Sequence, residues 1–396
     1  MSGHASGGLV YDVAPLTAQH REIARIQRAR GRSGLEPSER EALGSLHDGT
    51  PPGAPGSEAE VLRLLTRPFS RELAVPEYYQ YTCMHVYGWF LDHWPQDPVG
   101  AGLLALHTTL LDLLDVERTA LRRAGTVPRP DHIAERIALL EGLIGTVRET
   151  TADPFAPTRV GELADRATPG TEAARRIALL AECTRFPRSD RHEEHVFLRA
   201  VQACESVFFL VRRLAVEVAD TAREDGAGAG RRLAQAADCA ELLNGIFQVL
   251  RTLSPEGFMT FRDQTGQASA VQSLNYNTME IAVYGFDPRK REIYDSIGHL
   301  SVLNSPAVTG YRALSAVLAG TDDPVLSEGW KRLDRGLSRW RGSHYRFART
   351  YLPAGVKASG GTEGAAYVKK FVKKEACRPG DDPVSARELL SGFLFR

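Results

Sequence analysis

The sequence predicts an all-α fold, and three observations support this prediction. Apolar residues recur at steps of three and four over long stretches, as they do on the buried face of a helix. The two-residue alternation typical of strands is rare, and no Asn-Gly turn joins two strand-like runs. Glycine and proline cluster between the helical stretches, at 49–60 and 225–230.

Helices can be assigned in order along the chain. The first long one is predicted over 99–125, where the leucines that share one face are Leu103, Leu106, Leu110, Leu113, Leu114 and Leu121. Similar apolar stripes predict helices over 132–149, 195–220, 231–253 and 311–320. The loop at 49–60 is expected to end near a helix start at Ser57, and the glycine-rich run at 225–230 is expected to separate two helices.

The length of 396 residues allows one large domain or two ordinary ones, with ample core. We expect a partly flexible segment over 1–60, a helical N-terminal region over 61–175 and a second helical domain over 176–396. No internal repeat is evident.

Charge and cysteine content exclude several classes of function. The 49 basic residues balance the 49 acidic ones, which predicts no nucleic-acid or anionic-membrane partner. No apolar stretch reaches the roughly 20 residues needed to span a bilayer, and the first residues lack a signal-peptide pattern. Five scattered cysteines without CxxC spacing indicate reduced thiols and a cytoplasmic location, in place of disulfides or a zinc site.

Arg262 stands out because it lies in apolar company. Phe258 and Phe261 precede it, and a largely uncharged run of small residues and amides follows. A guanidinium group cannot shed its proton, so an arginine in such surroundings needs an anion. The sequence therefore raises the question of which anion Arg262 binds.

Two other segments have ordinary explanations when each is taken alone. His344 lies on an aromatic stripe, where a lone histidine is usually structural. The glycine-rich stretch at 359–367 matches no phosphate-binding pattern and is typical of a flexible loop.

Read together, four segments resemble the tryptophan 2,3-dioxygenase family in order and approximate spacing. They are HEEHVFLRAVQACESVFF (192–209), TLSPEGFMTFRDQTGQASAVQSL (252–274), WRGSH (340–344) and SGGTEGAAYVKK (359–370). Each motif alone is modest, but four in sequence are fairly specific. The resemblance covers about half of the chain and implies that 176–396 is a helical haem- and substrate-binding domain of that family's type.

The resemblance implies roles for two residues first. His344 falls where the family has the axial histidine of haem b iron, and a neutral imidazole suits ferrous iron. Arg262 falls where the family's arginine grips the carboxylate of the amino-acid substrate. The anion that Arg262 requires would then belong to the substrate.

Further family positions surround the expected substrate. Phe197 matches a phenylalanine of the aromatic pocket, and Ser269 matches a serine near haem and substrate. Ser359 takes the place of the loop threonine that meets the substrate's ammonium and carboxylate groups, and Gly360 would let the backbone close over the ligand.

Val201 departs from the family pattern. It stands where the family has a distal histidine that contacts the indole N–H, and an apolar side chain leaves a buried donor unsatisfied at about 1–3 kcal/mol. A modified or non-indole ring, a partner from elsewhere in the chain, or a water would each resolve this. The family's tyrosines ahead of this helix are also missing, so the aromatic segment around Tyr78, Tyr79 and Tyr81 either supplies that wall or belongs to the core.

The resemblance implies a haem-dependent oxygenase, mono- or dioxygenase, that acts with O2 on the ring of an aromatic amino acid. Tryptophan or a methylated tryptophan is the expected substrate, in secondary metabolism, and a homo-oligomer is the expected assembly. Two alternatives stay open from sequence: a tyrosine-type ring hydroxylase that uses peroxide, and a non-catalytic haem-binding sensor. Retention of Arg262 argues against the sensor, which needs no carboxylate clamp.

Overall fold

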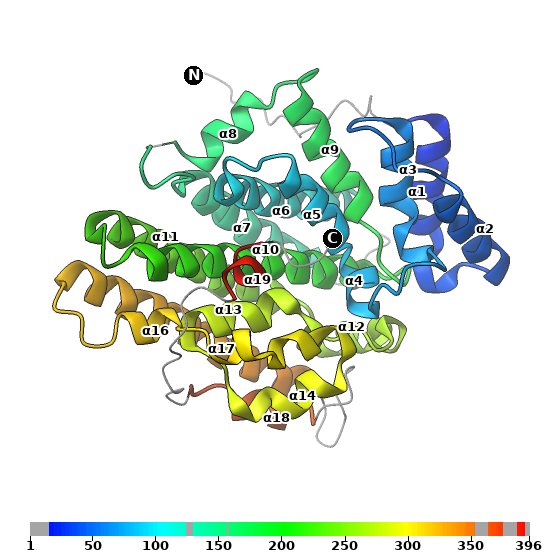
Figure 1. Cartoon of the computed structure of the whole chain (residues 1–396). Helices are drawn as coiled ribbons and strands as arrows, with labels where there is room; N and C mark the ends of the chain where they lie inside the picture. Colours follow the sequence, from blue (N-terminus) through cyan, green and yellow to red (C-terminus); the bar gives the residue numbers. More distant parts are fainter. Residues whose placement is uncertain (1–15, 124–129, 157, 353–362, 375–385, 393–396) are drawn as a thin grey trace.

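Helices account for almost all of the ordered backbone in the computed structural model, which describes residues 16–123, 130–156, 158–352, 363–374 and 386–392 (Figure 1). Within these ranges no strand forms, and an isolated bridge pairs Thr151 with Arg159. The predicted all-α class is confirmed.

The α-helices are α1 (Ala18–Arg30), α2 (Pro37–Asp48), α3 (Glu58–Thr66), α4 (Glu77–Thr82), α5 (Met84–Asp92), α6 (Pro98–Arg122), α7 (Pro130–Glu149), α8 (Val160–Arg166), α9 (Glu172–Thr184), α10 (His192–Thr221), α11 (Gly226–Leu250), α12 (Pro255–Arg262), α13 (Leu274–Tyr284), α14 (Arg291–Ser296), α15 (Pro306–Thr309), α16 (Leu314–Val317), α17 (Pro324–Tyr351), α18 (Ala365–Lys370) and α19 (Arg387–Ser391). Short 3-10 helices are η1 (Arg32–Gly34), η2 (Arg67–Phe69), η3 (Asp263–Thr265), η4 (Ala270–Gln272), η5 (Pro288–Lys290) and η6 (Gly298–Asn304).

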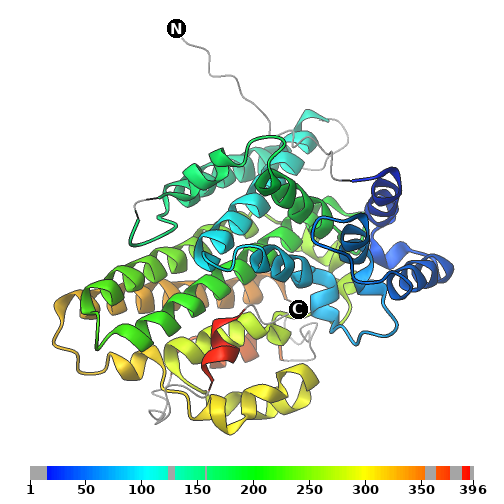
Figure 2. The ribbon, with the colours of Figure 1, turned by 45° about the horizontal axis from the view of Figure 1, so that its top comes forward.

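Five long helices organise the fold. Helix α10 packs against α6, α11 and α13, while α17 lies along α11 and α7 lies along α6 (Figures 1 and 2). The helices α1 to α3 sit at one end of this bundle, and α12 to α16 cover another side of it. The helices predicted over 99–125, 132–149, 195–220 and 231–253 correspond to α6, α7, α10 and α11.

The structure confirms one predicted helix start and corrects the expectations for two other segments, 225–230 and 311–320. Ser57 caps α3 as predicted, through a hydrogen bond from the backbone N–H of Glu60. The glycine-rich run at 225–230 does not form a separate loop, because Asp225 caps α11 and the helix begins at Gly226. The stretch 311–320 contains only the four residues of α16, a shorter helix than its pattern predicts.

Helix α6 corrects the expectation that no apolar stretch is long enough to span a bilayer, because by length and composition alone this helix could cross a membrane. In this fold 78% of its most apolar window is buried by the rest of the protein. It lies between α7, α10, α5 and α9, so its apolar residues form part of the core.

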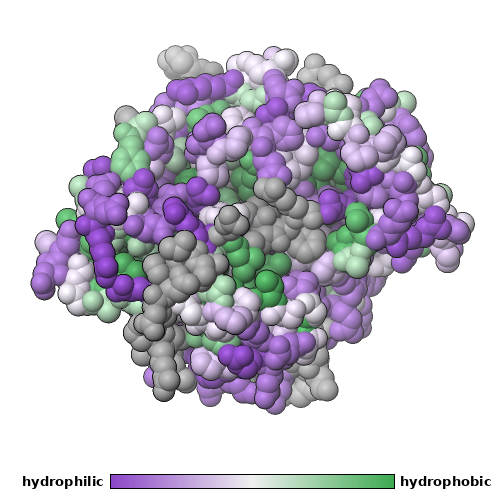
Figure 3. Space-filling view, viewed as in Figure 1, coloured by the Kyte–Doolittle hydropathy of each residue, from purple (hydrophilic) through white to green (hydrophobic). Residues whose placement is uncertain are grey.

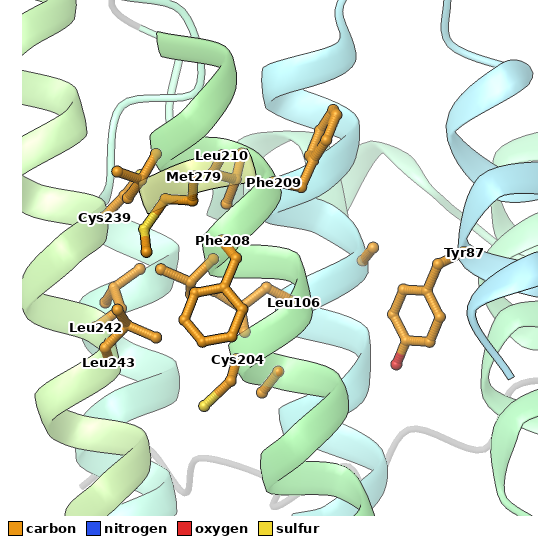
Figure 4. Packing of buried hydrophobic residues seen from close by; sticks show 14 of the residues in the cluster. Tyr87, Leu106, Cys204, Phe208, Phe209, Leu210, Cys239, Leu242, Leu243 and Met279 are labelled. Carbon is orange, nitrogen blue, oxygen red and sulfur yellow. The ribbon is translucent and has the colours of Figure 1, made fainter. Parts of the chain in front are cut away.

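One hydrophobic core joins the region over 61–175 to the region over 176–396. Figure 4 shows part of it, with Leu106 of α6, Phe208 of α10, Leu242 of α11 and Met279 of α13 among the buried side chains. Helices on the two sides of the predicted boundary near residue 175 therefore share buried contacts. On the face shown in Figure 3, hydrophilic side chains predominate and hydrophobic colour is confined to small areas.

A buried ion pair fixes α10 against α6 and α9. Arg199 donates to Asp112 Oδ2 from Nε at 2.9 Å and from Nη2 at 2.5 Å. Its Nη1 donates to Thr184 Oγ1 at 2.7 Å and to Gln202 Oε1 at 2.8 Å. Burial alone would raise the pKa of Asp112, but Arg199 and Arg185 beside it hold that pKa below its ordinary value. The carboxylate therefore stays charged inside the protein.

Replacing Arg199 with methionine should destabilise the protein strongly. The Arg199→Met variant leaves the buried Asp112 carboxylate without its main partner, so the free energy of unfolding should fall by about 3–5 kcal/mol. Urea unfolding followed by circular dichroism measures this. The matched control is Arg118→Met, which breaks a 2.7 Å pair with Glu141 whose side chains are 41% and 49% exposed and should change stability by at most about 1 kcal/mol. Equal losses in the two variants would contradict the prediction.

Candidate functional site

A cavity opens between α10, α11, α12, α13 and α17. Its volume is about 240 Å³, far more than the roughly 10–15 Å³ that a single water needs, and its whole empty space with the open mouth is about 1480 Å³. The lining residues are Tyr78, Phe197, Ala200, Val201, Cys204, Phe208, Phe247, Leu250, Phe258, Arg262, Ala268, Ser269, Ala270, Val271, Tyr276, Lys290, Trp340, Arg341, His344, Phe347, Ala348, Tyr351, Leu352, Gly364, Tyr367, Val368 and Phe371. Five residues predicted from sequence lie in this wall: Phe197, Val201, Arg262, Ser269 and His344.

Aromatic rings form one side of the cavity. Phe197 of α10 contacts Phe258 of α12 with ring centroids 5.4 Å apart. Phe347 and Tyr351 of α17 stack at 3.9 Å, and the Phe258 ring lies 6.1 Å from the first and 5.7 Å from the second. Such a wall offers flat apolar surface to a planar ligand.

Trp340 fixes the position of His344 on α17. Its indole packs edge-on against Phe208 of α10 at 5.3 Å, Tyr276 of α13 at 5.8 Å and Phe247 of α11 at 6.1 Å. His344 follows one helical turn later and lies 5.7 Å from both Trp340 and Phe247. The imidazole thus occupies a position set by rings from three other helices.

The His344 ring is chemically suited to binding a haem iron. Burial lowers its pKa to about 4, so the imidazole is neutral at neutral pH and keeps an unshared electron pair. No described residue makes a hydrogen bond to either ring nitrogen, and His344 lines an apolar cavity. The indole N–H of Trp340 is buried there without an acceptor among the described residues. A neutral histidine that faces a roomy aromatic cavity could hold the iron of a haem b group.

Arg262 ends α12 at the edge of the cavity. Its side chain is 13% exposed, and its Nη1 lies 4.0 Å from Asp263 Oδ1, at the limit of an ion pair. Because the Asp263 side chain is 90% exposed, this pair is weak. Arg262 lines the cavity, and a planar guanidinium has the geometry to bind a carboxylate at two points.

The loop after Arg262 is held by the N-terminal region of the same chain. Arg188 Nη1 donates to Glu77 Oε1 at 2.5 Å and to the carbonyl oxygen of Thr265 at 2.9 Å. The backbone N–H of Gln267 donates to Glu77 Oε2 at 3.1 Å. Gly266 adopts φ of 62°, and a Cβ there would lie 2.4 Å from Glu77 Oε1, so only glycine suits this turn. These contacts hold the segment that brings Ser269 to the cavity.

Tyr78 is the member of the N-terminal aromatic segment that reaches the cavity. It lines the wall together with Val201, whereas Tyr79 and Tyr81 are buried elsewhere in the core. Its hydroxyl donates to the buried Glu205 at 2.7 Å. The segment thus divides between the two expected roles, with one ring in the wall and the others in the core.

Val201 offers the cavity an apolar surface. It lies one helical turn after Phe197 on α10 and packs against the hydrophobic core. Its side chain has no hydrogen-bonding group, so a ring N–H placed against it would find no acceptor there. Ser359 and Gly360, expected at the substrate, fall in 353–362, outside the described residues.

Sequence reasoning missed a cationic part of the wall. Lys290 and Arg341 line the cavity beside Tyr276, Tyr367 and Phe371. Arg341 lies inside the Trp-Arg-x-x-His motif and could have been noticed there. Lys290 follows Arg289 and precedes Arg291, so its sequence context is that of an exposed basic turn and gives no sign of burial.

Comparison with known proteins shows similarity to tryptophan 2,3-dioxygenases. No protein-family model matches the chain. A tryptophan 2,3-dioxygenase of Bradyrhizobium sp. (strain ORS 278) is 35% identical over 95 residues, which are 24% of this chain and 34% of the relative. One from Ruegeria pomeroyi is 27% identical over 245 residues, 50% of this chain and 85% of the relative. One from Bacillus cereus (strain ATCC 10987 / NRS 248) is 30% identical over 108 residues, 27% and 39% of the two chains.

The match therefore spans about a third of the length of the Bradyrhizobium relative and most of the Ruegeria relative. Identities of this size over these spans show similarity between the chains. They carry no activity or substrate over to this chain by themselves.

Removing the His344 imidazole should abolish haem binding. The His344→Ala variant loses the nitrogen that we expect on the iron, so the purified protein should contain little haem unless free imidazole is supplied. Haem content and the Soret position measure this. The control is His93→Ala, since His93 lies outside the cavity wall and contacts the carbonyl oxygen of Trp89 at 2.7 Å. Normal haem content with an unchanged Soret band in the His344 variant would reject the assignment.

Proposed function

We propose that this protein is a haem-dependent oxygenase that acts on the ring of an aromatic amino acid. Tryptophan or a methylated tryptophan is the proposed substrate, O2 the proposed co-substrate, and secondary metabolism the proposed setting. The observation that carries the proposal is one cavity whose wall contains a neutral histidine, an arginine and an aromatic surface. The similarity to tryptophan 2,3-dioxygenases supports the same conclusion.

His344 would hold the cofactor and Arg262 the substrate. A haem bound at His344 supplies the iron that activates oxygen, which amino-acid side chains cannot do alone. The fork of Arg262 donors binds a carboxylate at two points and so orients the amino acid. Ser269, from the loop held by Glu77 and Arg188, would add a hydroxyl to the wall of the same cavity.

The aromatic wall would bind the substrate ring and exclude water. Phe197, Phe258, Phe347 and Tyr351 present faces and edges that pack against an indole or phenol. Water exclusion strengthens the charge-assisted bonds to Arg262, because the local dielectric constant is low. The chain's own contribution is thus binding, orientation and a dry environment.

Val201 favours a substrate that needs no acceptor for its ring nitrogen. Plain indole would leave its N–H unsatisfied against valine, at about 1–3 kcal/mol, unless another group accepts it. A methyl group on the ring or its nitrogen would instead fill apolar space. Of the two proposed substrates, Val201 therefore favours a methylated tryptophan over plain tryptophan.

Weakening the carboxylate clamp should reduce substrate affinity and leave the cofactor in place. Arg262→Lys keeps the positive charge but loses the bidentate fork, so binding of the amino acid should weaken by about 1.5–3 kcal/mol. Substrate-induced Soret shifts give the dissociation constant. The control is Arg339→Lys, which should change nothing, because Arg339 of α17 forms an exposed pair with Glu241 of α11. If the wild type binds the decarboxylated amine as tightly as the amino acid, Arg262 has another role.

Introducing a histidine at Val201 should move the preference toward plain tryptophan. One buried methylene is worth about 0.8 kcal/mol, so the wild type should favour a methylated tryptophan several-fold. In Val201→His the imidazole supplies an acceptor and takes up the space of the methyl group. The measurement is kcat/KM for tryptophan and its methylated analogues in both proteins, with products identified by mass. If the wild type already turns over plain tryptophan fastest and the variant behaves identically, the proposed specialisation is wrong.

A further inference from the structure

Lys290 is a buried lysine in the wall of the cavity. It ends η5, and its side chain is buried, with only 2% of the residue surface exposed. Its ammonium group donates to Asn277 Oδ1 at 2.9 Å and lies 4.5 Å from the centre of the Tyr276 ring and 5.4 Å from that of Phe371. These partners are an amide oxygen and two ring faces, and none of them carries a full negative charge.

The carboxylates near Lys290 are held by other cations. Asp287 accepts from Arg289 Nη2 at 2.8 Å and from Arg289 Nε at 2.9 Å. Glu280 lies 3.4 Å from Arg341 Nη1 and also pairs with Lys374. Within the described residues, no carboxylate oxygen lies within 4 Å of the Lys290 ammonium. Burial lowers the pKa of Lys290 to about 7, although Asp287 acts in the opposite direction.

Arg341 adds a second buried cation to the same part of the wall. It is 4% exposed, its guanidinium lies 4.8 Å from the centre of the Tyr284 ring, and its positive charge acts against that of Lys290. The Arg341 guanidinium already has the Glu280 carboxylate 3.4 Å away, whereas no ion pair joins the Lys290 ammonium to a carboxylate of the described residues. A buried cation needs an anion beside it, and Lys290 lines the cavity, so an anion bound in the cavity would reach it there.

We propose that Lys290, with Arg341 behind it, forms a carboxylate-binding subsite of the cavity that is separate from Arg262. The two subsites share none of the contacts described above: Lys290 lies among Tyr276, Asn277 and Phe371, and Arg262 adjoins α12 and Asp263. The inference rests on the proposed function for its ligand. Haem b carries two propionate carboxylates, while Arg262 serves the carboxylate of the amino acid, so a propionate is the ligand that we assign to Lys290.

The test compares porphyrins with and without carboxylates. The full-length chain, produced under iron limitation, is titrated with iron protoporphyrin IX and with its dimethyl ester, and the Soret absorbance gives both dissociation constants. We expect the wild type to prefer the free acid by about tenfold or more, the effect of one charge-assisted hydrogen bond. Lys290→Met should lose this preference, and Lys290→Arg should keep most of it.

Two controls separate the charge of Lys290 from general effects. Lys331→Met removes an exposed lysine of α17 outside the wall and should keep the preference for the free acid. Circular dichroism checks that the Lys290 variants fold, and Lys290→Gln replaces Lys290→Met if the latter does not. If the variant without the ammonium group retains the full preference for the free acid, Lys290 does not bind a propionate.

A second arm identifies the source of the carboxylate. Calorimetry compares binding of an aromatic amino acid with that of its decarboxylated amine, in the wild type and in the Lys290 variants. In one outcome, the Lys290 variants stop distinguishing the amino acid from the amine and still prefer the free-acid porphyrin to its ester. That result supports a carboxylate-binding subsite whose ligand is the substrate. If both preferences survive, the subsite is wrong. Should the wild type bind neither porphyrin, the proposed function fails, and the calorimetric comparison alone decides the role of Lys290.

Discussion

The packing of one indole, that of Trp340, is the constraint on which the cavity depends. Rings from α10, α11 and α13 meet it edge-on, at 5.3 to 6.1 Å between ring centres. Each such contact contributes about 0.5–1.5 kcal/mol beyond the area it buries, and each fixes the rotation of α17 about its axis. His344 lies one turn further along the same helix, so the same contacts decide that its imidazole faces the cavity.

The two sides of α10 explain why the N-terminal region belongs to the site. One side presents Phe197 and Val201 to the cavity, while the other buries Arg199, Gln202 and Glu205. Buried polar groups need partners, and regions before residue 176 supply several of them. The partners are Asp112 for Arg199, the Thr82 carbonyl oxygen for Gln202 and the Tyr78 hydroxyl for Glu205. Burial raises the pKa of Glu205, which hydrogen bonds from Tyr78 and Asn275 partly offset.

The helical class and the long amphipathic helices could be predicted from the sequence, because their period of three and four residues follows directly from burial of one face. The grouping of His344, Arg262, Phe197, Ser269 and Val201 followed from motif order. The structure places all five in one wall, and their roles stay proposals.

Other features depend on long-range packing that local patterns do not contain. Tyr78 could not be told from Tyr79 or Tyr81, since the six residues of α4 are too few for a period to show which ring faces the cavity. Lys290 lies in a run of basic residues, and the groups around its ammonium come from other elements, Asn277 of α13 and the ring of Phe371. At 225–230 the cap at Asp225 outweighed the low helix propensity of glycine, so a predicted break became a helix start.

The most direct test of the account is the absorption spectrum of the purified full-length chain, supplied with haem and then with aromatic amino acids. We expect a strong Soret band at near-stoichiometric haem, and a shift of that band when tryptophan or a methylated tryptophan is added. The amine without the carboxylate should produce a much weaker shift. A protein that takes up no haem, or a Soret band that no aromatic amino acid moves, would contradict the account.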